Sequence, residues 1–209
     1  MYLFLSSEFC LLHSSPIMSL RYLTSGESHG QALTVILDGM PSGVSVSSEY
    51  INYQLFRRQQ GYGRGGRMTI EKDQVQILSG VRFGKTLGSP IALQVHNKDW
   101  GVWSEEMAVE GDEKKSKRKV TRPRPGHADL TGGIKYSHTD LRNILERASA
   151  RETTVRVACG AVAKQFLSAF GIELVGYVVS IADVQLKPIK IPFEKIVRLS
   201  EASPVRTID

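Results

Sequence analysis

One histidine of this chain stands in a short loop whose composition would hold it in place. In Arg124-Pro-Gly-His-Ala-Asp129, His127 follows a proline and a glycine, and Asp129 comes two residues later. Histidine titrates near neutral pH, so it can donate or accept a proton there. A lone loop histidine is more often structural or exposed. The neighbouring cations nevertheless favour a proton-transfer group beside an anion: Arg122, Arg124, Lys135, Arg147 and Arg151.

Two of these cations belong to the segment Glu146-Arg-Ala-Ser-Ala-Arg-Glu152. Arg147 and Arg151 are four residues apart, so they would share one face of a predicted helix. The residues between them are small and would let a flat ligand lie against the backbone: Ala148, Ser149 and Ala150. In the alternative interpretation the segment is an ordinary helix, in which Glu146 and Glu152 pair with the two arginines.

A glycine-rich basic stretch, Gly61-Tyr-Gly-Arg-Gly-Gly-Arg67, lies further upstream and is predicted to be a loop. Four arginines surround it, and a guanidinium group binds phosphate or carboxylate through two parallel hydrogen bonds; they are Arg57, Arg58, Arg64 and Arg67. Two other interpretations stay open, an Arg/Gly segment that follows a nucleic-acid backbone and a solvated surface loop. A Walker phosphate loop is disfavoured because no Gly-Lys-Ser/Thr follows.

The stretch Gly26-Glu-Ser-His-Gly30 matches the G-x-S-x-G pattern of serine hydrolases letter for letter. That pattern requires a strand, a sharp turn and then a helix, whereas residues 32–37 predict a strand. A hydrolase is therefore disfavoured. The two glycines would still let a ligand approach Ser28 and His29 closely. The simpler alternative is a hairpin turn that contains polar residues.

Bulk composition is that of a soluble globular protein, with 41% hydrophobic and 23% charged residues in 209. This length suits one domain or most of one. The net charge of +6 favours anionic partners, which leaves nucleic acid, acidic membranes and phosphorylated metabolites open.

Cysteine usage and hydropathy indicate a reducing compartment. Cys10 and Cys159 match no metal-ligand spacing, and Cys159 reads as a small core residue. No apolar run approaches the roughly 18 to 20 residues of a membrane span. Residues 1–17 lack the basic start of a secretory signal. We therefore expect a cytoplasmic protein that needs no membrane.

The hydrophobic pattern predicts alternating strands and helices. Strands are expected at residues 21–24, 33–37, 74–81, 90–96 and 173–184. One helix should begin at Ser47 or Ser48 and end at Gly61, and a longer one should run from about 139 to 170. Residues 105–119 are expected to form a solvated surface insertion. Residues 1–18 differ in composition from the rest and are expected to be a poorly ordered extension.

Taken in series from Arg21 to Tyr177, these motifs resemble the chorismate synthase family. Gly26-Glu-Ser-His-Gly30, the Arg/Gly stretch through Met68, and the segment from Arg124 through Ala163 each resemble one of its signatures. The resemblance implies an α+β fold, the β-α-β sandwich of that family, and a homotetramer. It makes residues 19–209 the N-terminal portion of the family's domain.

The implied reaction is a lyase reaction, the last step of the shikimate pathway. Phosphate leaves 5-enolpyruvylshikimate 3-phosphate in a 1,4-anti elimination that gives chorismate and requires reduced FMN without net redox change. NADPH is a possible reductant. No metal ion and no nucleic acid are implied.

Residue roles carry over by position in the motifs. His29 matches the histidine that protonates the departing phosphate, and His127 the one that protonates reduced flavin. The positions expected around the substrate are Ser28, Arg58, Arg64, Arg67, Arg124 and Arg151. Arg58 and Arg64 are also linked to a nicotinamide nucleotide, and the flavin positions are Arg147, Ala148, Ser149 and Ala150.

Members of this family are longer, and their later half supplies further flavin and substrate contacts. We therefore expect an incomplete sandwich and little or no turnover from this chain alone, because residues that act as a unit are not additive. The alternative functions are a non-catalytic fragment that keeps flavin or anion binding or assists assembly, and a nucleic-acid module based on charge. The second is weakened because only Tyr62 lies among the basic residues.

Overall fold

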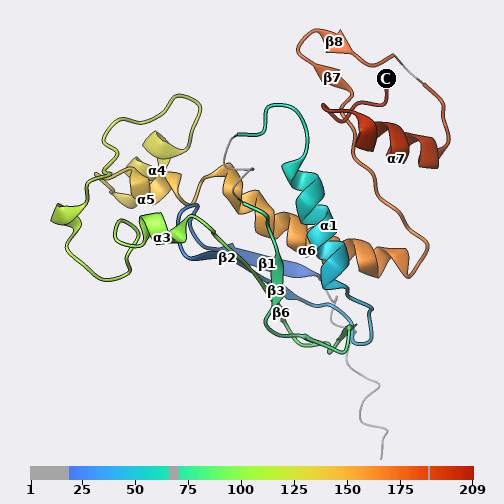
Figure 1. The fold of residues 1–209 in the computed structure, drawn as a ribbon, viewed down its shortest axis with the longest axis horizontal. Coiled ribbons are helices and arrows are strands. Elements are labelled where there is room, and N and C mark those ends of the chain that lie inside the picture. The colour runs from blue at the N-terminus through green and yellow to red at the C-terminus, as the bar shows by residue number, and fades with distance from the viewer. Residues whose placement is uncertain (1–18, 66–70, 188) are drawn as a thin grey trace, which may run out of the picture.

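The fold is a four-stranded antiparallel sheet covered on one face by two helices (Figure 1). This computed structural model describes residues 19–65, 71–187 and 189–209. The predicted extension at residues 1–18 and the site residue Arg67 lie outside the described residues. One sheet with one helical layer confirms the α+β class.

The sheet has the strand order β1-β2-β6-β3. Its strands are β1 (Arg21–Ser25), β2 (Ala32–Asp38), β6 (Ile91–His96) and β3 (Val75–Ile77). In β2 and β6 every second residue is buried, and the pairing of Leu33 with Val95 brings these residues to one face. This period of two, read in the sequence, is what predicted the central strands correctly.

The helices α1 (Ser48–Gln59) and α6 (Thr153–Ser168) cover that apolar face. The Ser47 hydroxyl accepts a hydrogen bond from the backbone N–H of Tyr50, which confirms the predicted helix start. Ile51 and Leu55 of α1 pack with Val155 and Val162 of α6 in a core fully closed to solvent.

Short elements fill the connections. They are β4 (Val81–Arg82), β5 (Lys85–Thr86), α3 (Trp100–Trp103), η2 (Glu113–Lys115), α4 (Asp129–Tyr136), α5 (Arg142–Leu145), η3 (Ala150–Glu152), β7 (Ser180–Ile181), β8 (Val184–Gln185) and α7 (Phe193–Ala202). Residues 105–119 contain no buried residue, so the predicted surface insertion is confirmed.

The single helix predicted at residues 139–170 is wrong in its first half. Helix α5 ends at Leu145, η3 follows, and α6 begins only at Thr153. Ser149 is extended, with φ −63° and ψ 146°, and its hydroxyl accepts a hydrogen bond from the backbone N–H of Arg151. Such local bonds compete with the helix.

Two strand predictions are also corrected. Residues 173–179 form no strand, although they are rich in strand-forming types. Pairing begins only at Ser180 and Ile181, which form β7 and pair with β8. Strand propensity is realised only where a neighbouring strand offers its backbone groups. The strand predicted at 74–81 is interrupted after Ile77, and Gly80 at φ +79° turns the chain.

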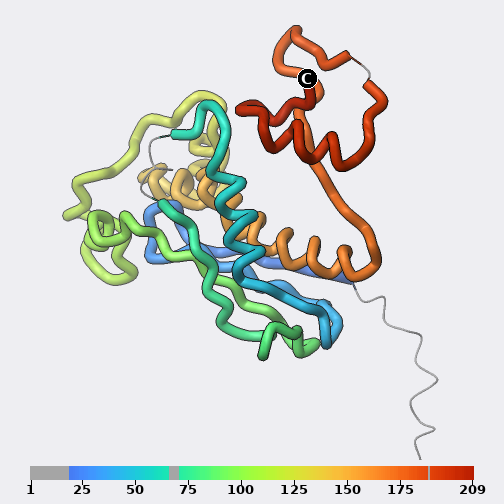
Figure 2. The backbone as a smooth tube through the Cα atoms, turned by 45° about the vertical axis from the view of Figure 1, so that its right-hand side comes forward, coloured from blue at the N-terminus to red at the C-terminus, as the bar shows by residue number. Residues whose placement is uncertain are grey.

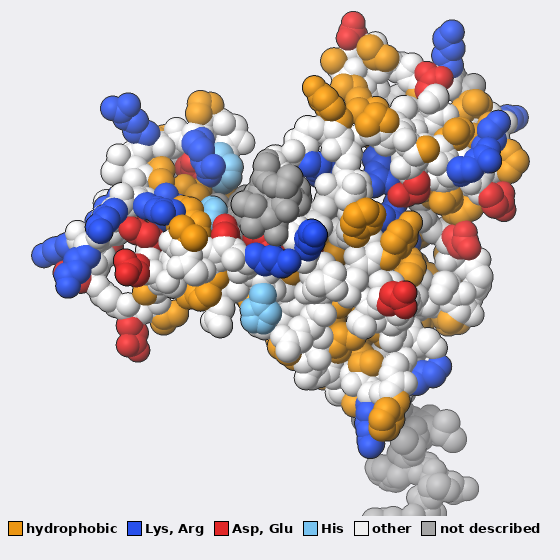
Figure 3. All heavy atoms as spheres, in the orientation of Figure 1, with side chains coloured by type: hydrophobic (Ala, Val, Ile, Leu, Met, Phe, Trp, Pro, Cys, Tyr) orange, Lys and Arg blue, Asp and Glu red, His pale blue; other side chains and the backbone are white. Residues whose placement is uncertain are grey.

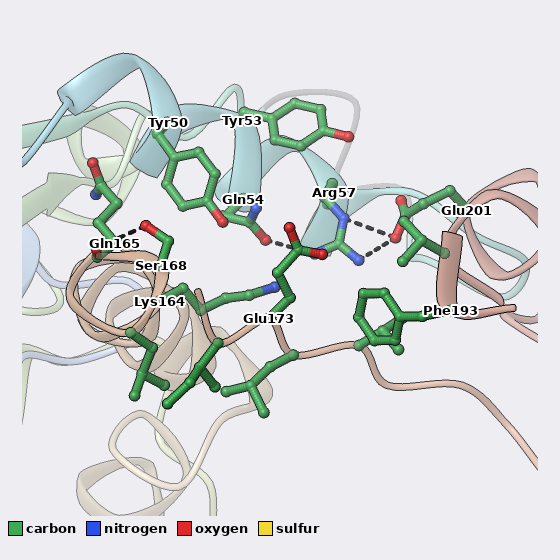
Figure 4. A pocket seen from close by; sticks show the side chains of 15 residues that line it. Tyr50, Tyr53, Gln54, Arg57, Lys164, Gln165, Ser168, Glu173, Phe193 and Glu201 are labelled. Carbon is green, nitrogen blue, oxygen red and sulfur yellow. Dashed lines mark hydrogen bonds and ion pairs between the residues drawn. The ribbon is translucent and has the colours of Figure 1, made fainter. Parts of the chain in front are cut away.

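An extended segment leads from α6 to the C-terminal part, where α7 lies near the end of α1 (Figure 2). A cavity of about 410 Å³ separates α1 and α6 from α7 (Figure 4). Across it, Arg57 forms an ion pair with Glu201, whose other oxygen accepts from Arg206. The hydrogen bond from Arg57 lowers the pKa of Glu201 to about 2.

We expect Glu201→Gln to loosen α7. A carboxylate whose pKa is lowered on folding stabilises the fold above its unfolded pKa, near 4.5, and loses this effect as the pH falls toward 2. Because the pair is partly exposed, we expect a loss of about 1 kcal/mol in unfolding free energy at pH 7, shrinking below pH 4.5. Urea unfolding across pH measures it. Glu194→Gln, on an exposed residue of the same helix, is the control, and equal losses in both variants would contradict the assignment.

Two glycine substitutions should change stability in opposite directions. A methyl group on Gly132 of α4 would lie 2.4 Å from Cγ2 of the buried Ile144, whereas one on Gly160 of α6 meets nothing within 4 Å. Gly132→Ala should therefore cost about 1 to 3 kcal/mol by overpacking. Gly160→Ala should add about 0.5 to 1 kcal/mol by helix propensity. Thermal and urea unfolding measure both changes in unfolding free energy. A change of the same sign in both variants would contradict tight packing of α4 on α5.

Candidate functional site

Three segments that are distant in sequence meet at the start of α6. The turn at residues 26–30, the broken segment 146–152 and the residues after β6 are joined by hydrogen bonds. Ser28 donates its backbone N–H to the carbonyl of Glu146 at 2.9 Å, and the Asn97 amide donates to the carbonyl of Gly30 at 2.7 Å. In Figure 3, histidine side chains lie among arginines and lysines on this face.

Local backbone requirements explain the turn. Gly26 has φ +100°, and a Cβ there would lie 2.3 Å from the carbonyl oxygen of Ala32, so only glycine fits. The chain continues directly into β2 rather than into a helix, which confirms that the serine-hydrolase context is missing. Ser28 itself is buried and His29 stands at the edge of the site.

His29 is held by a buried carboxylate and an aromatic ring. Its Nδ1 lies 2.8 Å and 3.0 Å from the two carboxylate oxygens of Glu146, and its backbone N–H donates to the same group at 2.9 Å. The imidazole stacks on Trp103 with 4.0 Å between ring centroids. Its Nε2 lies 3.8 Å from Asp99.

The charge of Glu146 is balanced on two sides. Burial alone would raise the pKa of this carboxyl group, but the hydrogen bonds and charges of His29 and Arg142 outweigh it and lower the pKa. Arg142 Nη1 donates to Oε1 at 2.8 Å. Glu146 is therefore a stable anion behind His29.

Sequence reasoning missed Trp103 and Asp99 and treated Glu146 only as an arginine partner. The guanidinium groups of Arg118 and Arg142 lie 4.0 Å and 5.1 Å from the ring centroid of Trp103. The one available signal was that both tryptophans of the chain, Trp100 and Trp103, directly follow the strand β6.

His127 forms a second, similar cluster. Its Nδ1 lies 2.5 Å from Oδ1 of the fully buried Asp129, whose Oδ2 accepts from the side-chain Nε of Arg124 at 2.9 Å. The hydrogen bond from Arg124 holds the pKa of Asp129 far below its usual range. Gly126 at φ +72° forms the loop that the sequence predicted. The charge of Glu146 contributes to the raised pKa of Arg124, so the two histidine clusters are within electrostatic range.

Arg151 is almost closed to solvent and bridges two segments. Its Nη1 donates to Asp73 at 2.7 Å and its Nε to Asn97 at 3.0 Å, while its Nη2 lies 3.3 Å from Glu71. Arg58 reaches the same Asp73 with 3.5 Å between Nη1 and Oδ2. The structure thus brings Arg58 and Arg151 together, as expected of one site.

Three buried polar atoms of this network have no hydrogen-bond partner among the described residues: Arg58 Nη1, Asp73 Oδ2 and Arg151 Nη2. Buried donors are almost always satisfied by protein, water or ligand. Burial also lowers the pKa of Arg58, although Asp73 opposes this effect. Both guanidinium atoms face carboxylates at ion-pair distance, Arg58 Nη1 that of Asp73 at 3.5 Å and Arg151 Nη2 that of Glu71 at 3.3 Å.

Arg147 and Arg151 do not share a helix face, which corrects the prediction. Arg147 turns to β1, where its Nη2 donates to the Thr24 carbonyl at 2.9 Å, and it lies 3.6 Å from Glu152. The alternative interpretation, in which Glu146 and Glu152 pair with the two arginines, therefore holds for Arg147 with Glu152, whereas Arg151 pairs with Glu71 and Asp73 instead. The reason is the extended Ser149, which rotates the two arginines apart.

The remaining predicted residues are more open. Ala148 and Ala150 are exposed and Ser149 is half-buried, so this stretch presents accessible backbone beside Arg147. Arg64 is exposed and donates through Nε to the Gln60 carbonyl at 3.0 Å. The cavity between α7 and the helices α1 and α6 is lined by Arg57, one of the four arginines around the glycine-rich stretch, but by none of the residues expected around the substrate or the flavin.

In the part of the chain that the structure describes, no group of three or more His, Cys, Asp or Glu side chains could hold a metal ion. In the same residues, no helix has the length and apolarity to cross a membrane.

Comparison with known proteins gives one consistent result. A family model described as chorismate synthase matches residues 20–209. Chorismate synthase of Aquifex aeolicus is 64% identical over 171 residues, covering 82% of this chain and 43% of that protein. Chorismate synthase 1 of Bacillus cereus is 58% identical over 195 residues, covering 91% and 50%.

A solved structure titled "Crystal Structure of Chorismate Synthase" superposes with a TM-score of 0.69 at 46% identity, covering 91% of this chain and 48% of that one. The chain spans about half the length of the curated relatives it matches. Since the family match extends over nearly all of the described residues, this chain belongs to the chorismate synthase family.

Proposed function

We propose that this chain forms one wall of a chorismate synthase active site, where phosphate is eliminated from 5-enolpyruvylshikimate 3-phosphate. The observation that carries the proposal is that a carboxylate-bound histidine, His29, lies in one hydrogen-bonded site with the buried cation Arg151, through Asn97. The substrate has two carboxylates and a phosphate, so several cations are needed to replace its hydration.

In this proposal His29 donates a proton to the departing phosphate. Because Nδ1 is bound to Glu146, the opposite nitrogen, Nε2, would be the donor atom. Arg58 and Arg151 would contribute positive charge to the binding of the anionic groups of the substrate. Further contacts would come from the other predicted substrate residues: Ser28, Arg64, Arg67 and Arg124.

The residues around η3 fit reduced FMN. Arg147 offers a cation, and the exposed Ala148 and Ala150 with Ser149 offer a flat, accessible backbone edge. When bound, reduced flavin would supply electron density to the breaking C–O bond. His127, which Asp129 holds through Nδ1 and whose Nε2 lies 3.1 Å from Arg124 Nη2, is proposed to protonate reduced flavin. NADPH is the proposed reductant, with Arg58 and Arg64 on its phosphate.

The rest of the proposal follows the family. We expect a cytoplasmic homotetramer without nucleic acid. The relatives carry as much chain again outside the matched half, so turnover by this chain alone is expected to be little or none. The second candidate is a fragment that keeps flavin or anion binding or assists assembly. It is favoured by the same observation, that the chain matches only about half the length of its relatives.

Activity can be tested by complementation. The chain should form little or no chorismate in an anaerobic assay with reduced FMN, but should do so when mixed with the separately produced later half of the Aquifex aeolicus relative. In that mixture His29→Ala and His127→Ala should each lower kcat about 10²- to 10⁴-fold, the usual contribution of a general acid. Ordinary rates from the chain alone would refute the expected inactivity. No chorismate from any mixture that binds flavin would refute the function.

Flavin binding tests the residues around η3. Arg147→Ala should weaken FMN binding by the chain about tenfold, the value of one charge-assisted contact. Arg156→Ala, an exposed arginine that also pairs with Glu152, is the matched control and should leave the affinity unchanged. Fluorescence titration measures both. If Arg147→Ala and the wild type bound FMN with equal affinity, Arg147 would not belong to the flavin site. RNA binding that falls steeply with salt would favour the nucleic-acid alternative.

A further inference from the structure

We propose that Glu146 and Trp103 are positioning residues that make Nε2 of His29 its proton-donating atom. The inference rests on the proposed function for its catalytic meaning. Its structural content, a fixed tautomer and a fixed ring, does not depend on that function.

A single carboxylate binds both the ring and the backbone of His29. Oε2 of Glu146 lies 2.8 Å from Nδ1 and accepts the backbone N–H at 2.9 Å. A carboxylate anion can only accept hydrogen bonds, so Nδ1 must carry the hydrogen. In the neutral ring Nε2 is then bare, and the exchangeable proton of the charged ring resides there.

The environment of Glu146 keeps it in this role. Its side chain is fully buried, so its charge requires partners at each oxygen. Arg142 supplies one bond to Oε1 at 2.8 Å, and His29 supplies the others. In the Nε2-protonated neutral form, the Nδ1 lone pair would face only the acceptor oxygens of Glu146, so that form has no favourable contact at Nδ1.

Trp103 fixes the plane of the imidazole. The two rings are 4.0 Å apart at an interplanar angle of 28°, so the indole covers one face of the imidazole. Arg118 and Arg142 in turn pack on the indole, which anchors it. A half-turn of the imidazole about its Cβ–Cγ bond would break both Glu146 contacts of Nδ1. Nε2 therefore faces the half-exposed side near Asp99.

A purely structural role for Glu146 is the competing explanation. Its backbone carbonyl accepts from Ser28, and this contact alone could hold the turn. Glu146→Gln separates the two, because it keeps the backbone bond and the side-chain shape while it removes the charge and replaces one acceptor oxygen with an NH2 donor. Glu152→Gln is the matched control, since it neutralises a carboxylate of the same segment that does not touch His29.

The first test is the tautomer of His29, read from ring ¹⁵N shifts in the labelled 209-residue chain. The wild type should show hydrogen on Nδ1, Glu146→Gln should lose this preference, and Glu152→Gln should keep it. Trp103→Leu should keep the tautomer and broaden the ring resonances. A wild-type ring protonated on Nε2 when neutral would overturn the proposal even if no variant folded. An unchanged tautomer in a folded Glu146→Gln would overturn it as well.

The second test is kinetic and uses the complemented enzyme. Glu146→Gln should lower kcat about 10²-fold and leave KM within about twofold, because the donor is misaligned while substrate binding is intact. A change in KM alone would overturn the positioning role. Absence of chorismate in wild-type mixtures would instead refute the proposed function, and the tautomer measurement would still decide the inference.

Discussion

Two opposite charges buried in one short segment, Glu146 and Arg151, organise this end of the molecule. A buried ion is tolerated only when its partners are in place. Glu146 takes its partners from the turn at residues 26–30 and from α5, and Arg151 takes Asp73 and Asn97 from the connections beside β3 and β6. Satisfying these two charges therefore assembles the site.

The same demand explains why the chain leaves helical geometry here. A continuous helix would place residues 147 and 151 on one face. The extended Ser149 and the short η3 instead direct Arg147 toward β1 and Arg151 toward the interior. The sheet and the two long helices supply the rigid frame, and this irregular segment supplies the chemistry.

The two histidines are held by the same kind of contact. His29 and His127 each bind a buried carboxylate through Nδ1, and each carboxylate is also held by an arginine. Hydrogen bonds, chiefly from His29 to Glu146 and from Arg124 to Asp129, lower the pKa of both carboxyl groups and so keep them ionised. Such pairs hold an imidazole in one orientation, as proton transfer requires.

Local pattern determined much of this protein by itself. The alternation in residues 32–38 and 91–96, the serine cap of α1 and the turn-forming glycines depend on near neighbours, as did the motifs that indicated the family. The partners of Glu146, the stacking of Trp103 on His29 and the break at Ser149 were decided only by the tertiary structure. The contacts of His29 with Glu146 and Trp103 join residues more than 70 positions apart, and no local spacing encodes which buried charge will meet which partner.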